Sequence, residues 1–133
     1  MMEEKIFRSF ENQEERRALG GSCFIEFQYC RHPKGTAVQE IVDSIRHWEN
    51  ASLYVHGDDQ AAFYEQYASL MSGCIHGNLQ SGIIDMWGIN YYSCQQTEEV
   101  LAAIKSAKPS DYQILAEWLE RAKELNGFYI LGI

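Results

Sequence analysis

The sequence predicts an α+β fold, with a mixed or largely parallel sheet of about four or five strands covered by about four helices. Apolar residues recur with helical spacing in some segments and with strand spacing in others, and the two kinds of segment alternate along the chain. A crossover helix between two strands favours parallel pairing. Two consecutive helices near the C-terminal end make strict α/β less favoured, so a three-layer α/β fold is the alternative.

Strand patterns occupy several short segments. Residues 22–30 alternate between two faces. The other predicted strands are 52–56 and 128–133. The segment 82–93 is either one long strand or a hairpin that turns near Trp87 and Gly88. Residues 6–10 form either an edge strand or a short helix.

Capping residues and apolar stripes predict two long helices, over 35–52 and 110–127. Each begins with a capping box, in which a Ser or Thr side chain and a Gln three residues later satisfy free N–H groups. The boxes are Thr36 with Gln39 and Ser110 with Gln113. Gly127 ends the second helix in the left-handed conformation.

Two further helices are predicted, one from Asp58 and one over 97–107. The buried side of the helix that starts at Asp58 consists of Phe63, Tyr67, Leu70 and Met71. Tyr64 and Glu65 then point away from that side. We therefore expect these two side chains to be exposed.

The length and composition indicate a single globular domain over 1–133. The 133 residues are 46% hydrophobic and 23% charged, which is typical of folded proteins. No apolar run is long enough to span a bilayer, and the N-terminal segment lacks the apolar centre of a secretory signal. We expect a cytoplasmic protein that does not bind membranes and whose four cysteines are reduced.

The charge distribution predicts a cationic partner. Nineteen acidic and eleven basic residues give a formal net charge of −8. No Lys or Arg occurs from His47 through Ile104, whereas seven carboxylates do. Such a surface repels nucleic acids and anionic membranes and attracts basic proteins. The alternative is that the charge serves solubility alone.

Two Cys-x-His pairs raise the question of a metal site. They are Cys30 with His32 and Cys74 with His76. Structural zinc sites usually space their ligands more widely, so that a loop can turn both side chains onto one ion. We therefore predict no metal. The glycines match no nucleotide-binding motif, and we predict no cofactor.

A small enzyme or ligand-binding domain is the alternative function. His56, Asp58 and Asp59 lie at a strand-to-helix junction, where active sites of α/β folds gather. Asp85 lies among apolar residues, where a buried carboxylate needs partners or a shifted pKa, so it is a functional candidate. Alternatively, Asp85 marks an exposed strand face or a turn. No activated nucleophile accompanies them, and the junction aspartates are also explained as a helix cap and a first-turn charge.

In size, acidity and its closing helix followed by a strand, the sequence resembles bacterial immunity proteins that neutralise nuclease toxins. The resemblance is one of class and covers no shared motif, so it assigns no residue a role. It implies a non-catalytic inhibitor that masks the active surface of a basic partner.

The predicted partner-binding surface combines carboxylates with aromatic anchors. Its residues are Asp58, Asp59, Tyr64, Glu65, Asp85, Trp87 and Tyr91. Opposite charges would speed association, and buried aromatic rings would slow dissociation.

Overall fold

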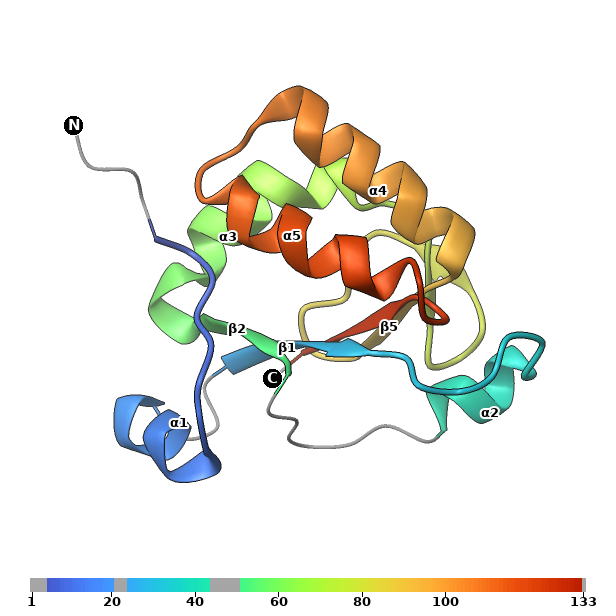
Figure 1. Cartoon of the computed structure of the whole chain (residues 1–133), viewed down its shortest axis with the longest axis horizontal. Coiled ribbons are helices and arrows are strands. Elements are labelled where there is room, and N and C mark those ends of the chain that lie inside the picture. The colour runs from blue at the N-terminus through green and yellow to red at the C-terminus, as the bar shows by residue number, and fades with distance from the viewer. Residues whose placement is uncertain (1–4, 21–23, 44–50, 133) are drawn as a thin grey trace.

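The computed structural model describes residues 5–20, 24–43 and 51–132, and its centre is one six-stranded sheet (Figure 1). The strands are β1 (Phe24–Tyr29), β2 (Leu53–His56), β3 (Cys74–His76), β4 (Ser81–Gly82), β5 (Ile89–Tyr92) and β6 (Phe128–Leu131). Their order across the sheet is β2-β1-β6-β5-β3-β4, and every neighbouring pair is antiparallel.

In the part of the chain that the structure describes, five α-helices and two short 3-10 helices pack around the sheet. They are α1 (Gln13–Gly20), α2 (Val38–Val42), the turn η1 (Gly57–Asp59), α3 (Gln60–Tyr67), the turn η2 (Ala68–Leu70), α4 (Cys94–Ala107) and α5 (Tyr112–Ala122). Helices α3, α4 and α5 cover one face of the sheet, and α2 lies on the other side (Figure 1). No helix in the described ranges is long and apolar enough to cross a membrane.

The prediction of a mixed or largely parallel sheet with four or five strands is wrong, because the described sheet has six strands and all its neighbouring pairs are antiparallel. A single crossover helix, α3, does connect two strands of the same direction, β2 and β3. Three antiparallel strands separate them in the sheet, so they never pair. Between β5 and β6 the chain makes two helices instead of one. The first helix runs back along the sheet, and the second returns the chain to the end of the sheet where β5 finishes. β6 therefore starts beside the end of β5 and pairs with it antiparallel.

The main core lies between the sheet and helices α3, α4 and α5. Alternate residues of β1, Ile25, Phe27 and Tyr29, face these helices. Phe27 packs against Phe128 of β6, with parallel rings 6.2 Å apart. The opposite face of the sheet is also largely buried, and all six residues of β1 are buried. Burial of both faces accounts for the nearly continuous apolar runs in the sequence.

The capping residues differ from those expected. Thr36 and Ser110 do not cap: the helices nearest them begin after Ala37 and Asp111, without a side-chain cap bond. The capping box forms instead at Ser93 and Gln96, ahead of α4. In all three candidate boxes the Gln lies three positions after the Ser or Thr. This spacing alone therefore does not distinguish a capping box that forms from one that does not.

Two chain segments join distant parts of the fold. Gly127 has a φ of +84°, and a Cβ at this position would lie 1.9 Å from the carbonyl oxygen of Tyr92, so only glycine fits where the chain enters β6. The N-terminal segment is extended and forms an isolated bridge from Arg8 to Tyr54 beside β2. This agrees with the edge-strand alternative for residues 6–10.

The segment 82–93 turns where expected, but the two strands around the turn do not pair with each other. Both β4 and β5 pair with β3, which lies between them. Residues 83–88 therefore return across β3 to connect β4 with β5. Ile84 of this connection is buried in the main core, which places the crossing on the helix-covered face.

Candidate functional site

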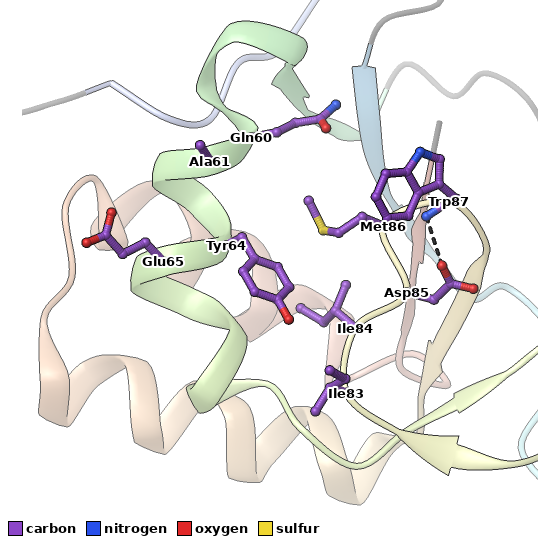
Figure 2. A pocket seen from close by; sticks show the side chains of 9 residues that line it. All are labelled: Gln60, Ala61, Tyr64, Glu65, Ile83, Ile84, Asp85, Met86 and Trp87. Carbon is purple, nitrogen blue, oxygen red and sulfur yellow. Dashed lines mark hydrogen bonds between the residues drawn. The ribbon is translucent and has the colours of Figure 1, made fainter.

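An apolar groove with a volume of about 750 Å³ opens between α3 and the segment 83–87 (Figure 2). Gln60, Ala61, Tyr64 and Glu65 belong to its helical wall, and the five consecutive residues 83–87 form the other wall. This volume is within the range of small-molecule binding pockets. We name it the α3 groove.

The helical wall follows from the pattern of α3. Phe63 and Tyr67 are fully buried against the core, as predicted. Tyr64 and Glu65 lie on the outer side of the helix, and the Tyr64 side chain remains 39% exposed. Met71 is buried as predicted, whereas Leu70, which follows α3 in η2, is only half-buried.

The opposite wall exposes two large apolar side chains. Ile83 is 60% exposed and Trp87 is 79% exposed, while Ile84 between them is buried. Isolated exposed apolar side chains are common on protein surfaces. Here Ile83 and Trp87 face the same groove as Tyr64, so the exposed apolar surface is contiguous (Figure 2).

Asn90 of β5 holds this wall in place. Its side chain is fully buried and its Oδ1 accepts a hydrogen bond from the backbone N–H of Asp85 at 2.7 Å. Its Nδ2 donates to the carbonyl oxygens of Asp85 at 2.9 Å and of Ile130 at 3.0 Å. One side chain therefore ties the turn to β5 and β6.

A second set of contacts fixes the tip of the turn. The Asp85 Oδ1 accepts from the backbone N–H of Trp87 at 3.0 Å, and the N–H of Gly132 donates to the carbonyl of Gly88 at 2.8 Å. A Cβ on Gly132 would lie 2.5 Å from the backbone of Met86, so this close approach requires glycine. Trp87 is thus an exposed ring on a well-anchored turn.

The structure brings four predicted site residues to one place. Tyr64, Glu65, Asp85 and Trp87 all line the α3 groove, although the two pairs are about twenty residues apart in the sequence. Asp85 lies in a turn and is exposed, which matches one of the alternatives open for it. The described lining residues include two carboxylates and no Lys, Arg or His.

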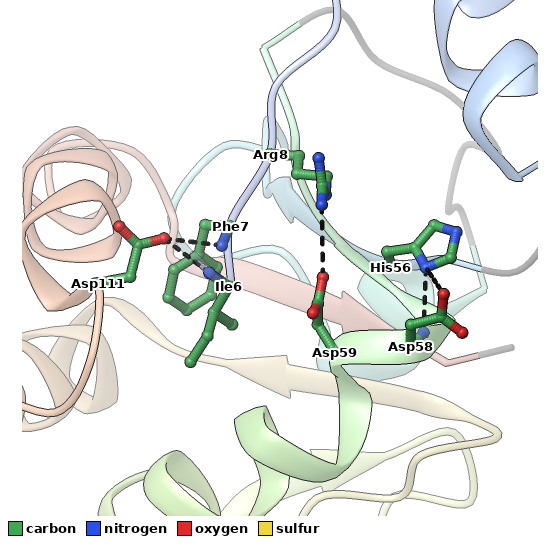
Figure 3. A network of polar contacts seen from close by, with 7 residues as sticks. All are labelled: Ile6, Phe7, Arg8, His56, Asp58, Asp59 and Asp111. Carbon is green, nitrogen blue, oxygen red and sulfur yellow. Dashed lines mark hydrogen bonds and ion pairs between the residues drawn. The ribbon is translucent and has the colours of Figure 1, made fainter. Parts of the chain in front are cut away.

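Asp58 and Asp59 lie in η1, immediately before α3 (Figure 3). The His56 Nδ1 accepts a hydrogen bond from the Asp58 N–H at 3.0 Å, so His56, and not Asp58, caps this turn. The Asp58 side chain is 93% exposed. Asp59 lies 3.8 Å from the Arg8 guanidinium, which partly neutralises it. Asp58 is therefore the more available of the two carboxylates.

The contacts in this region stabilise the fold. Asp111 accepts hydrogen bonds from the N–H groups of Ile6 and Phe7 at 3.0 and 2.9 Å, and so holds the N-terminal segment near α5 (Figure 3). Together with the Arg8 contact to Asp59, these bonds give the junction a structural role. Asp85, which the small-enzyme alternative combined with this junction, lies instead in the 83–87 wall of the α3 groove.

Tyr91 takes no part in the groove. It is buried in a second apolar cluster on the opposite face of the sheet, where its hydroxyl donates to the carbonyl of Asn126 at 2.7 Å. Burial raises the pKa of its phenol far above the ordinary value. The expectation that Tyr91 belongs to an exposed surface is therefore wrong.

The two Cys-x-His pairs do not converge. Cys30 is buried in the cluster on the outer face of the sheet, while Cys74 lies in the main core. The Cys74 thiol donates weakly to Gly82 O and Asn90 Oδ1, both at 3.5 Å. Within the described ranges, no three His, Cys, Asp or Glu side chains are placed to share a metal ion.

Sequence reasoning missed several groove residues. Gln60, Ile83 and Met86 belong to no motif in the sequence and therefore gave no signal of their own. Asn90 could have been noticed as a polar residue between Ile89 and Tyr91. A buried amide in a strand needs hydrogen-bond partners, and its partners here are the turn that forms the groove.

Comparisons with protein-family models, with curated protein sequences and with solved structures gave no match.

Proposed function

We propose that this protein is a non-catalytic binding protein, of the kind represented by immunity proteins, that inhibits a basic partner such as a toxin nuclease. The observation that carries the proposal is the α3 groove. It joins contiguous exposed apolar side chains to Glu65 and Asp85, with no basic residue among its described lining residues.

Physical reasoning supports a protein partner. Large aromatic residues such as Trp87 and Tyr64 are enriched at the centres of binding interfaces, whereas carboxylates around them guide a cationic partner during association. Trp87 is also held on an anchored turn, so that little conformational freedom is lost when it is covered. The free thiols of Cys30, Cys74 and Cys94 fit a reducing compartment such as the cytoplasm.

The test uses the purified protein as bait for lysate of its source cells, followed by purification of the captured protein and an assay of its activity. We expect a basic protein whose activity falls on binding. Its binding should weaken for the double variant Asp58→Lys/Glu65→Lys, since both carboxylates are exposed and lie on α3, the helical wall of the groove, or in the turn just before it.

The matched control is Glu99→Lys/Glu117→Lys, which makes the same change in net charge at exposed positions of α4 and α5. Equal weakening by both double variants would mean that only the total charge matters. An acidic partner, or a captured protein whose activity is unaffected, would contradict the proposal. The small-enzyme alternative gains no support from the described contacts of His56 and Asp59, which serve the fold.

A further inference from the structure

We propose that the α3 groove binds a polypeptide segment of the partner in which apolar side chains are flanked by lysine or arginine. This inference rests on the proposed function and specifies what the groove receives. It follows from where the apolar and the charged atoms of the groove lie.

The surface facing the interior of the groove is apolar. Tyr64 extends from α3 toward Ile83 and Ile84, and Met86 extends from the opposite wall (Figure 2). Covering exposed apolar surface is favourable roughly in proportion to its area. The occupant therefore places apolar side chains in the interior of the groove.

The two carboxylates lie at the outer margins. Figure 2 shows Glu65 pointing away from the groove on the far side of α3, and Asp85 turned back toward the Trp87 backbone. No described cation lies within ion-pair distance of either carboxylate. Positive charges on the occupant therefore belong on both sides of its apolar residues, where they meet these carboxylates.

The exposure of Trp87 favours a polypeptide over a small ligand. A molecule confined to the groove would cover only the part of the indole that lines it, and the ring is 79% exposed. The Nε2 of Gln60, in the helical wall, also lacks a hydrogen-bond partner among the described atoms. A main-chain carbonyl of a bound segment could accept from it after a rotation of the side chain.

A second copy of this chain does not fit the same surface. The net charge is −8, and pairing two such grooves would bring carboxylates of like charge together. A basic partner removes this repulsion. The charge of the groove thus selects among the apolar segments that could fill it.

The first test measures the binding of three fluorescein-labelled peptides by anisotropy. One peptide combines leucines at helical spacing with flanking lysines, the second has serine in place of leucine, and the third has glutamate in place of lysine. We expect the leucine–lysine peptide to bind at least about tenfold more tightly than either of the others. Equal binding of the serine–lysine peptide would overturn the inference, because charge alone would then suffice.

The second test compares Ile83→Gln with Ile114→Gln. Both isoleucines are exposed, but Ile83 lines the groove and Ile114 lies on α5. We expect Ile83→Gln to weaken binding of the leucine–lysine peptide about fivefold or more, and Ile114→Gln to leave it unchanged. Thermal melting checks that both variants are folded. An equal effect of the two substitutions would place the peptide elsewhere and overturn the inference.

The outcomes separate this inference from the proposed function. One outcome is that a basic partner is inhibited but binds the Ile83→Gln variant as tightly as the original protein. This outcome supports the proposed function and contradicts the inference. Groove-dependent binding of the leucine–lysine peptide, with no basic protein captured from the lysate, supports the inference and contradicts the proposed function.

Discussion

The outer surface of α4 and α5 and the margins of the α3 groove both carry carboxylates, but the two regions differ in whether a lysine lies beside the carboxylate. On α4 and α5, Glu120 lies 2.6 Å from Lys105 Nζ and 3.0 Å from Lys123 Nζ. Hydrogen bonds from these two lysines lower the pKa of Glu120. Glu65 and Asp85 have no described cation within ion-pair distance. Glu120 is neutralised by its lysine neighbours, whereas Glu65 and Asp85 leave their negative charge available to a partner.

The two regions also differ in how their exposed apolar residues are grouped. Ile114 on α5 is an isolated exposed side chain, which needs no functional explanation. Ile83, Tyr64 and Trp87 are exposed together around one groove. The comparison teaches that net charge and exposed apolar residues become informative when the structure shows where they coincide.

The largest expected effect is that of Trp87→Ala on partner binding. Removing the ring should raise the Kd about 30-fold or more, mainly through faster dissociation, because aromatic anchors contribute about 2 kcal/mol or more. The change is measured by surface plasmon resonance with the captured partner. Ile114→Ala is the control and should change the Kd less than about twofold. A Trp87→Ala variant that binds normally would remove the distinction between the two regions.

Asn90→Ala should come next and should act on stability as well as binding. It leaves the N–H of Asp85 without its side-chain acceptor and removes one hydrogen bond each from the carbonyls of Asp85 and Ile130, which should cost about 1–3 kcal/mol in the free energy of unfolding. Urea denaturation measures this cost, and hydrogen exchange should increase at the Trp87 amide. Asn78→Ala removes an exposed side-chain contact to Gln80 and should change stability by less than about 0.5 kcal/mol. Similar losses for both variants would contradict the central role of Asn90.

A smaller effect is expected from single charge reversals. Glu65→Lys should slow association with a basic partner about threefold to tenfold at low salt and reduce its salt dependence, because electrostatic steering acts on the association rate. Glu117→Lys makes the same charge change on α5, where the surface carries lysines, and should slow association less. Stopped-flow measurements at two salt concentrations would show equal slowing if the position of the charge were irrelevant.

The smallest effect concerns Glu26, a third kind of carboxylate that is neither paired with lysine nor exposed. Burial raises its pKa above the ordinary value of 4.5, and hydrogen bonds from Ser52 and Gln28 offset part of this rise. The folded state therefore holds the proton more tightly than the unfolded state. The contribution of Glu26 to the free energy of unfolding is therefore fully present below pH 4.5. It should be lost as the pH rises through the raised pKa.

Glu26→Gln should remove this part of the pH dependence. Melting temperatures at several pH values from about 4 to 8 measure it, and partner binding should stay unchanged within about twofold. A variant that keeps the full decrease in stability would show that other groups are responsible.

Local patterns predicted much of the fold, because burial on one side of a segment is recorded in residue spacing. The strands near 24–29, 53–56 and 128–131 and the two sides of α3 were predicted in this way. The strands β3 and β4 have only three and two residues, too few to show an alternation. The predicted helix over 35–52 is described only as α2, and residues 44–50 lie outside the described ranges.

Strand order could not be predicted, because it depends on pairings between distant residues. Glu26 lies opposite Leu131, and neither local sequence indicates this partner. The groove itself was not predicted, for the same reason. Tyr64, Glu65, Asp85 and Trp87 were chosen by residue type, and only the fold brings them to one groove. Tyr91 was chosen by type as well, but both faces of β5 are covered at that point.

The central position of β6 has a consequence for folding kinetics. β6 joins β2-β1 to β5-β3-β4, so the two parts of the sheet cannot combine until the last described strand is in place. Such long-range pairing raises the contact order and slows folding. One wall of the groove, α3, follows β2, and the other wall, residues 83–87, precedes β5. Because β2 and β5 lie in the two parts of the sheet that β6 joins, the groove is completed late. A partner that binds only the finished groove would then draw newly made chains into the folded state by mass action.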